Sequence, residues 1–239
     1  MRQIKGHITG QMIDFKRPDG QSVNGYLAEA VNPVASLVVI QEWWGLNDQI
    51  RGVADRAAAA GFTALVPDLY RGKSTVEAEE AHHLMTGLNF GDAASQDVRG
   101  AVQFLKGRKA GSGKVGVTGF CMGGALTVLT ASMVPEAGAA VVWYGLPPLE
   151  YVDASKIKMP LMAHWATQDQ VFGIDSVDAL EQKLKAAGVS VESHRYLASH
   201  GFANETAQGP GRIEATQYDA AWAQLAWDRT MRFLGANLR

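Results

Sequence analysis

Cysteine is almost absent from this chain, whose 239 residues include only Cys121. A single cysteine cannot form a disulfide within the chain, so stability must come from a hydrophobic core. With 47% hydrophobic residues the chain can build such a core, and its length suits one α/β domain. We therefore expect residues 1–239 to form a single domain in which Cys121 serves either packing or chemistry.

An excess of positive charge and long apolar runs are also missing. The 22 Lys and Arg are balanced by 24 Asp and Glu, and no basic cluster is available to neutralise phosphates. No segment stays apolar for the roughly 18 residues of a membrane span, and residues 1–10 lack the apolar stretch of a signal peptide. We expect a cytoplasmic monomer that binds neither nucleic acid nor membrane.

Short β-branched runs alternate with helical patterns and predict an α/β fold. Extended segments at 12–15 and 23–27 flank the turn signal of residues 17–20, which predicts an antiparallel hairpin. The strands expected after it are 37–40, 63–66, 114–118, 140–143, 160–166 and 191–197. Because helices separate these strands, we expect a mostly parallel, doubly wound sheet covered on both faces.

Apolar residues recur at helical spacing between the predicted strands. The pattern of 50–58 predicts a helix that ends near Gly61, and similar patterns occupy 98–105, 177–187 and 218–234. Residues 70–92 are the least regular part of the chain. We expect them to form a lid or a wall of the pocket.

The motif Gly119-Phe-Cys-Met-Gly123 follows a predicted strand and opens a predicted helix of residues 122–133. This is the context of a nucleophile elbow, a sharp turn that exposes its central side chain. Side chains at Gly119 or Gly123 would collide with the neighbouring strand and helix. The start of a helix also favours a thiolate. The alternative for Cys121 is a small buried hydrophobe.

Asp169 and His200 follow the nucleophile in the order expected of an acid and a base in a triad. Asp169 comes just after the strand 160–166, and His200 lies on the loop after the last strand. His200 would take the thiol proton and later activate water, while Asp169 would orient the imidazole. The alternative for Asp169 is an Asx turn.

Five other histidines and one glycine motif are further candidates for chemistry. His82 and His83 suit a solvated lid, His7 lies near the terminus, and His164 and His194 fall in strands where packing is the simpler role. No spacing typical of a metal site is present, so we expect no metal. Residues 111–116 match the dinucleotide motif G-x-G-x-x-G, but they precede their strand, so we expect no cofactor.

Hydrolysis at Cys121 would also need donors for the negatively charged carbonyl oxygen. The backbone N–H of Met122 is one by the geometry of an elbow, and the second is expected on the loop after an early strand. That loop is 41–45, where we assign the N–H of Trp43.

Taken together, these motifs resemble the dienelactone hydrolase family over nearly the whole chain. The matching pieces include Gln41-Glu42, residues 67–70, residues 119–124, Gln168-Asp169 and residues 200–203. The resemblance implies an α/β-hydrolase fold with a Cys121-His200-Asp169 triad. It also implies that Glu42 is a buried carboxylate near the thiol, able to accept its proton when substrate binds; the alternative is a structural carboxylate. Tyr144 matches a family tyrosine.

The resemblance breaks at the arginines that bind a substrate carboxylate in the family's best-known members. One arginine position is Asn204, four residues after His200, and the segment 76–85 contains no arginine. Arg71 or Lys73 could substitute for the missing charge. Trp43, Trp44 and Phe202 near the expected pocket favour apolar or aromatic groups, so we assign Trp44, Tyr144, Arg71, Phe202 and Asn204 to substrate binding.

The leading hypothesis is hydrolysis of activated carboxylic esters or small lactones through a thioester on Cys121. A narrower alternative is a dienelactone hydrolase that prefers an anionic lactone (carboxymethylenebutenolidase activity). An alternative of another class is a non-catalytic ligand-binding or redox-sensing relative in which Cys121 is oxidised. An NAD-dependent enzyme is a more distant hypothesis.

Overall fold

A computed structural model describes residues 9–239 of the chain. Residues 1–8 lie outside the described residues. They include His7 and most of the stretch on which the expectation about a signal peptide rests. Among residues 9–239 no helix is both long and apolar enough to cross a membrane.

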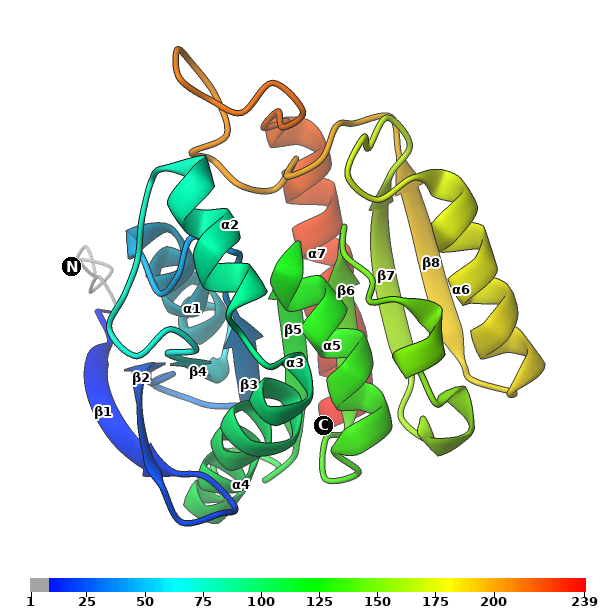
Figure 1. Cartoon of the computed structure of the whole chain (residues 1–239). Coiled ribbons are helices and arrows are strands. Elements are labelled where there is room, and N and C mark those ends of the chain that lie inside the picture. Colours follow the sequence, from blue (N-terminus) through cyan, green and yellow to red (C-terminus); the bar gives the residue numbers. More distant parts are fainter. Residues whose placement is uncertain (1–8) are drawn as a thin grey trace, which may run out of the picture.

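One sheet of eight strands runs through the described chain, in the order β1-β2-β4-β3-β5-β6-β7-β8 (Figure 1). β1 and β2 form the predicted antiparallel hairpin, and β2 also pairs antiparallel with β4. All other pairs are parallel. The strands are β1 (Gln11–Lys16), β2 (Ser22–Ala28), β3 (Ala35–Ile40), β4 (Phe62–Pro67), β5 (Val115–Phe120), β6 (Ala139–Trp143), β7 (Leu161–Ala166) and β8 (Val191–Tyr196).

Helices cover both faces of the sheet, with α4, α5 and α6 on one face and α1 and α7 on the other (Figure 1). The α-helices are α1 (Asp48–Ala59), α2 (Ala78–Thr86), α3 (Phe90–Asp92), α4 (Arg99–Arg108), α5 (Met122–Met133), α6 (Ile174–Ala186) and α7 (Ala220–Leu238). The π-helix η1 (Ala93–Val98) leads into α4, and two short 3-10 helices are η2 (Leu149–Tyr151) and η3 (Ala154–Lys156).

The central strands are apolar on both sides because both of their faces are covered. Every residue of β3, β4, β5, β6 and β7 is buried, whereas β1 and β8 at the edges alternate or are largely exposed. Alternate side chains of each central strand therefore enter two separate cores. Val38 and Val117 point into the core under α4 and α5, while Leu37 and Val141 point into the core under α1 and α7.

The predicted fold class is confirmed, and two details differ from the sequence expectation. Residues 70–92, expected to be irregular, contain α2 and α3. The two apolar stripes near the C-terminus belong to one helix, α7, whose residues Leu234 and Leu238 pack against Gly116 of β5. Gly116 has no side chain, and a Cβ there would lie 2.8 Å from Leu238.

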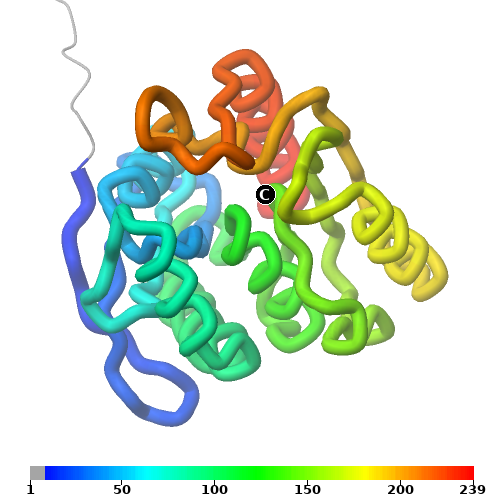
Figure 2. The backbone as a smooth tube through the Cα atoms, turned by 45° about the horizontal axis from the view of Figure 1, so that its top comes forward, coloured from blue at the N-terminus to red at the C-terminus, as the bar shows by residue number. Residues whose placement is uncertain are grey.

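The strand order changes direction at β3. The chain passes from β3 to β4 on one side and then returns to β5 on the other side of β3. Loops that leave β3 and β5 therefore diverge, and ligands of open α/β sheets bind at such points. Figure 2 shows the loop after β8, drawn in orange, passing over the end of the sheet where these loops begin.

Candidate active site

Cys121 occupies the sharp turn between β5 and α5 with left-handed backbone geometry, φ 53° and ψ −116°. Such a conformation is costly for a residue with a side chain and is a mark of functional turns. The turn is possible because its neighbours are glycines. A Cβ on Gly119 would lie 2.1 Å from the carbonyl oxygen of Gly123, and one on Gly123 would lie 2.4 Å from that of Ile40.

His200 lies between Cys121 and Asp169 and contacts both. Its Nε2 is 3.1 Å from the Cys121 sulfur, and its Nδ1 is 2.8 Å from Oδ2 of Asp169. The His200 side chain is 6% exposed and that of Asp169 is 2% exposed, while Cys121 is partly accessible. The structure thus brings together the three predicted triad residues from three separate loops.

Asp169 combines the two roles that the sequence left as alternatives. Its Oδ1 accepts hydrogen bonds from the backbone N–H of Val171 and of Phe172, at 2.7 and 2.8 Å, which forms an Asx turn. Its other oxygen, Oδ2, faces His200. The turn fixes the carboxylate, so the imidazole is held in one orientation.

The charges around His200 favour its protonated form. Burial alone would lower its pKa, but the negative charge on Cys121 and the hydrogen bond to Asp169 outweigh burial and raise the pKa to about 10. A protonated imidazole 3.1 Å from the Cys121 sulfur is an acid that can protonate a leaving group.

The two amides predicted to bind the carbonyl oxygen follow two neighbouring strands, β3 and β5. Trp43 follows β3, Met122 begins α5, and within residues 9–239 neither N–H donates to a backbone or side-chain acceptor. An unpaired donor at the first turn of a helix is available to a ligand. Trp43 is half-buried and packs edge-to-face with Trp44, with ring centroids 5.1 Å apart.

Glu42 is buried beside the triad but bonds to neither Cys121 nor His200. Tyr144 donates its hydroxyl hydrogen to Oε1 at 3.2 Å, and Asn204 donates from Nδ2 to Oε2 at 2.7 Å. Burial raises the pKa of Glu42 because both of these partners are neutral and desolvation dominates. In this state both carboxyl oxygens are occupied, and the carboxyl group serves to join three segments of the chain.

Tyr144 connects Glu42 to the triad histidine. Its backbone is left-handed, with φ 35°, and its ring packs edge-to-face on His200 with centroids 5.3 Å apart. The ring is fully buried, and the next residue, Gly145, touches the elbow so closely that a Cβ would lie 1.9 Å from the Cys121 carbonyl oxygen. The Tyr144 ring therefore packs against the imidazole of His200, whereas the sequence predicted that Tyr144 contacts substrate.

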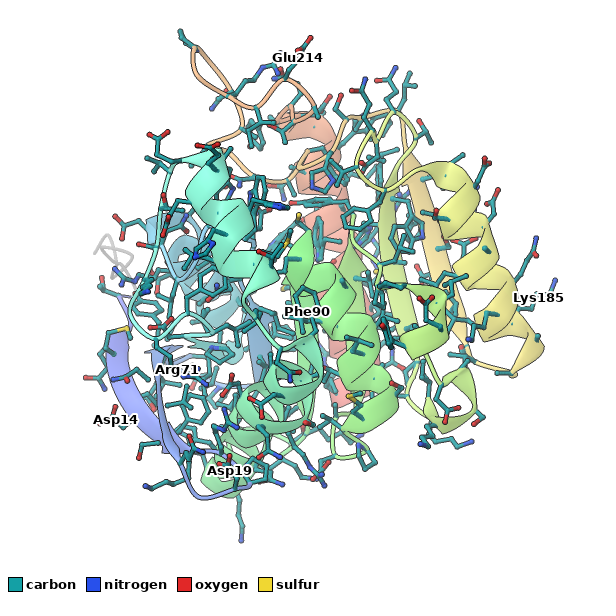
Figure 3. All side chains as sticks on the ribbon, viewed as in Figure 1. Asp14, Asp19, Arg71, Phe90, Lys185 and Glu214 are labelled. Carbon is teal, nitrogen blue, oxygen red and sulfur yellow. The ribbon has the colours of Figure 1, made fainter. Side chains whose placement is uncertain are left out.

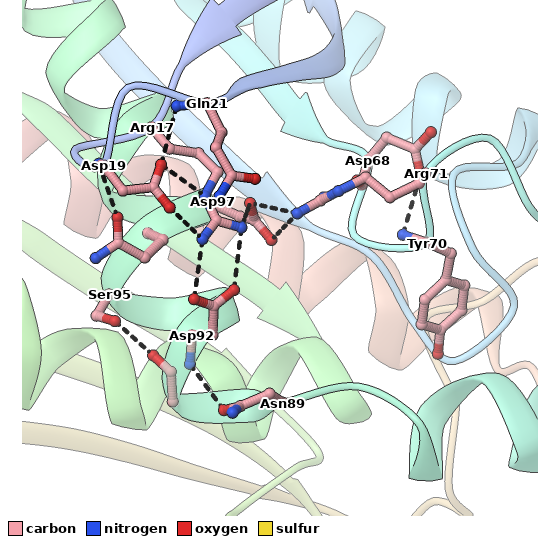
Figure 4. A network of polar contacts seen from close by, with 12 residues as sticks. Arg17, Asp19, Gln21, Asp68, Tyr70, Arg71, Asn89, Asp92, Ser95 and Asp97 are labelled. Carbon is pink, nitrogen blue, oxygen red and sulfur yellow. Dashed lines mark hydrogen bonds and ion pairs between the residues drawn. The ribbon is translucent and has the colours of Figure 1, made fainter.

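Other residues assigned to substrate binding have contacts elsewhere. Arg71 donates to Asp97 at 2.8 and 3.0 Å and to the carbonyl oxygen of Asp68, as Figure 4 shows. In Figure 3, Arg71 lies beside the β1–β2 hairpin, below α2. Phe202 is fully buried against Tyr144 and Tyr196. These contacts argue against substrate binding by Arg71 and Phe202. Asn204 is likewise engaged, because its amide donates to the carboxyl group of Glu42. Trp44 is half-buried and keeps an accessible ring surface.

The remaining histidines lie outside the triad. His164 is buried and hydrogen-bonded to Tyr196 and Thr230, both at 2.8 Å, and burial lowers its pKa well below the usual value. His194 bonds Glu192, and His82 and His83 are exposed on α2. Among the described residues no group of His, Cys, Asp and Glu is arranged to hold a metal.

Two contacts next to the site were not predicted from the sequence. Gln41 accepts a hydrogen bond from Leu69 N–H, which ties the loop after β3 to the loop after β4. The hydroxyl of Tyr70 lies 3.2 Å from the sulfur of Met122. Gln41 and Tyr70 belong to motifs that resemble those of the dienelactone hydrolase family, but a motif does not indicate which loops come into contact.

Comparison with known proteins shows which family this chain resembles in sequence and in fold. The sequence model of the dienelactone hydrolase family matches residues 23–238. Protein usf of Aquifex pyrophilus is 36% identical over 232 residues, which cover 94% of this chain and 97% of that protein. A dienelactone hydrolase-like promiscuous phosphotriesterase from metagenomic libraries has a similar structure, with a TM-score of 0.84 and 23% identity over 98% of this chain and all of that one.

A more distant solved structure, an esterase of Pyrococcus furiosus, superimposes with a TM-score of 0.71 and 18% identity, covering 97% of this chain and 94% of that one. At such identity the likeness concerns the fold alone. The arrangement of the sheet and its helices is thus that of the α/β-hydrolase fold.

Proposed function

Because the chain belongs to the dienelactone hydrolase family, we propose that it hydrolyses activated carboxylic esters or small lactones through a thioester on Cys121. The observation that carries the proposal is the position of His200, 3.1 Å from the Cys121 sulfur and 2.8 Å from Asp169. A thiolate suits good leaving groups, which favours esters and lactones over amides.

In the first half of the reaction the Cys121 thiolate attacks the carbonyl carbon, and the C=O electron pair moves onto oxygen. The N–H groups of Met122 and Trp43 stabilise this negative oxygen. When the C=O bond re-forms, the bond to the alkoxide breaks, and the His200 imidazolium gives the alkoxide its proton. The acyl group remains bound to sulfur as a thioester.

In the second half a water molecule attacks the thioester. Neutral His200 takes a proton from water as the new C–O bond forms, and the same amides stabilise the negative oxygen again. The C–S bond then breaks and returns the thiolate beside the imidazolium. Asp169 keeps its hydrogen bond to Nδ1 throughout, which stabilises the charged imidazole and fixes its orientation.

We propose that the substrate is neutral near its acyl group. Arg71 is paired with the buried Asp97, and Asn204 donates to Glu42, so neither position offers a free cation to a substrate carboxylate. Trp43 and Trp44 are half-buried apolar rings on the loop after β3. A neutral aryl ester is expected to show a higher kcat/KM than a lactone that carries a carboxylate, and the opposite order would favour narrow dienelactone hydrolase activity.

The test of the thioester is mass spectrometry of the protein during turnover of an aryl ester. The acyl mass should appear on Cys121, and Cys121→Ala should lower kcat/KM by at least about a thousandfold. His200→Gln should do the same, whereas the control His194→Gln alters a histidine that bonds only Glu192 and should retain activity. A fully active Cys121→Ala enzyme would exclude the mechanism.

Absence of hydrolysis across a panel of esters and lactones, in a folded protein, would instead favour the binding or redox-sensing alternative. Reversible modification of Cys121 by peroxide would then distinguish a redox sensor from a ligand-binding protein.

A further inference from the structure

Two tyrosines flank the elbow, one in each of the two cores of the protein. Tyr144 lies in the core under α1 and α7, and Tyr70 lies with Met122 in the core under α4 and α5. The negative charge on Cys121 contributes to raising the pKa of both tyrosines, after the larger effect of burial. Both hydroxyls therefore stay protonated and able to donate.

The two hydroxyls differ in what they donate to. The Tyr144 hydroxyl is engaged by the carboxyl group of Glu42. The Tyr70 hydroxyl donates to the thioether sulfur of Met122 at 3.2 Å. A thioether is a weak acceptor. A carbonyl oxygen that gains negative charge is a far stronger one, so a phenol in this position can exchange sulfur for such an oxygen.

The ring of Tyr70 is held firmly by the loop that carries it. Asp68 accepts hydrogen bonds from the N–H of Tyr70 and of Gly72, and Leu69 donates to Gln41. Arg71, in a left-handed conformation with φ 55°, is anchored on Asp97. Figure 4 shows the Tyr70 ring extending away from that cluster. The ring is 7% exposed, so little freedom remains except at its hydroxyl.

Tyr70 shares a core with the residues predicted to supply the two backbone donors. Met122, whose sulfur it contacts, follows Cys121 directly and supplies one predicted N–H for the negative oxygen. Trp43, which supplies the other, packs against the same core. The two residues that carry the predicted donors thus have side chains in the same core as Tyr70.

We propose that Tyr70 is a catalytic residue whose hydroxyl moves from the Met122 sulfur to the negatively charged acyl oxygen and donates a third hydrogen bond to it. The proton stays on the phenol, and no bond other than hydrogen bonds is made or broken by Tyr70. This assignment rests on the proposed hydrolysis through Cys121.

Tyr70→Phe tests the proposal by removing only the hydroxyl. With an aryl ester we expect kcat to fall about ten- to a hundredfold, less than for loss of a backbone donor, because two N–H groups remain. KM should change less than about threefold, since the hydrogen bond is much weaker to a neutral carbonyl than to the charged oxygen. The control is Tyr26→Phe, which removes a buried hydroxyl that bonds Asp55 and Gly10, and it should leave kcat unchanged.

A second readout follows the acyl oxygen itself. In the thioester formed from a ¹³C-carbonyl ester, the infrared band of the carbonyl should move to higher wavenumber in Tyr70→Phe, because a donor is lost. Replacement of Tyr70 by p-aminophenylalanine keeps the shape and a weaker N–H donor, so it serves if the Phe variant folds poorly. Its kcat should lie between those of the wild type and Tyr70→Phe.

Wild-type kcat and an unshifted carbonyl band in Tyr70→Phe would overturn the proposal, as would a rise in KM at constant kcat. Failure of the underlying hydrolysis has a different signature. In that case no acyl mass appears on Cys121 of the wild-type protein, whereas here the adduct forms in both proteins and only its rates and spectrum differ.

Discussion

Single atoms decide the chemistry of this site. Asp169 uses one oxygen for the Asx turn and the other for His200, so one residue both shapes its loop and holds the imidazole of His200. Glu42, in contrast, has both oxygens engaged by neutral donors in a buried place. The two carboxyl groups lie in one site with different environments, and their expected roles differ accordingly.

The protonation of His200 depends on the charge of Cys121. A negative charge on Cys121 and the hydrogen bond to Asp169 together outweigh burial and raise the imidazole pKa to about 10, so Cys121→Ser, which removes that charge, should lower it. At pH 8 the imidazole should be largely protonated in the wild type and less so in the variant. NMR titration of the imidazole measures both pKa values, and equal values would contradict the ion pair; resonances of His194 provide the control.

Glu42 gives a second prediction, on stability. Its folded pKa is raised above the ordinary value of 4.5, so the folded chain keeps a proton that the unfolded chain loses. The free energy of unfolding of the wild type, relative to Glu42→Gln, should therefore be highest below about pH 4.5 and fall as pH rises through the folded pKa. Denaturant unfolding at several pH values measures this difference.

At neutral pH Glu42→Gln should be tolerated, because an amide can accept from Asn204 and donate to the Tyr144 oxygen. Glu42→Ala should cost roughly 2–4 kcal/mol, since it leaves a cavity and two buried polar groups without their partner. A pH-independent difference between wild type and Glu42→Gln would contradict the raised pKa.

Secondary-structure elements meet around a second buried carboxylate, Asp97. This residue of η1 is 1% exposed and binds Arg17 of the β1–β2 turn as well as Arg71 of the loop after β4 (Figure 4). Arg17 also pairs with Asp19 and Asp92. The cluster joins the hairpin, the π-helix and the loop that carries Tyr70.

Asp97→Ala should therefore destabilise the protein by roughly 3 kcal/mol, because it leaves the buried guanidinium of Arg17 without its deepest partner. The control Asp178→Ala breaks an ion pair with Arg195 at the surface and should have a much smaller effect. Urea unfolding compares the two variants, and equal losses would show that the Asp97 cluster is no more than a surface network.

The elements also mark how far local patterns predict structure. The helix predicted at 122–133 has those bounds in the structure because the glycines of the elbow signal its start. Residues 70–92 lacked a clear pattern, yet α2 forms there with only Ala81 buried, so no apolar stripe announces it. Asp97 is buried by the wider turn of η1, and no sequence signal distinguishes a π-helix from the α-helix that follows.

At the scale of the whole molecule, the edges of the sheet bear on association. β8 exposes Glu192 and Arg195, and β1 exposes Asp14 and Lys16. Charged side chains on edge strands oppose pairing with a second sheet. We therefore propose a monomer. Light scattering of the eluted protein should give a mass near 25.6 kDa, and twice that mass would contradict the proposal.

The loop after β8 projects beyond the sheet, and Glu214 lies on it (Figure 3). It returns to the site through two backbone hydrogen bonds. The N–H of Gln217 donates to the carbonyl oxygen of His200, and the N–H of Asp219 donates to the carbonyl oxygen of Phe202. The triad histidine is thus fixed by backbone on both sides, and its position depends on residues far along the chain.

The sequence alone determined the alternation of strands and helices, the elbow at Cys121 and the order of Asp169 and His200, because these features follow from local periodicity, turn chemistry and one short motif. Only the tertiary structure decided where side chains without a local signal would point. It turned Arg71 toward Asp97, gave Glu42 to Tyr144 and Asn204, and brought the Tyr70 hydroxyl onto Met122. Such contacts join loops far apart in sequence, and burial selects among their possible partners.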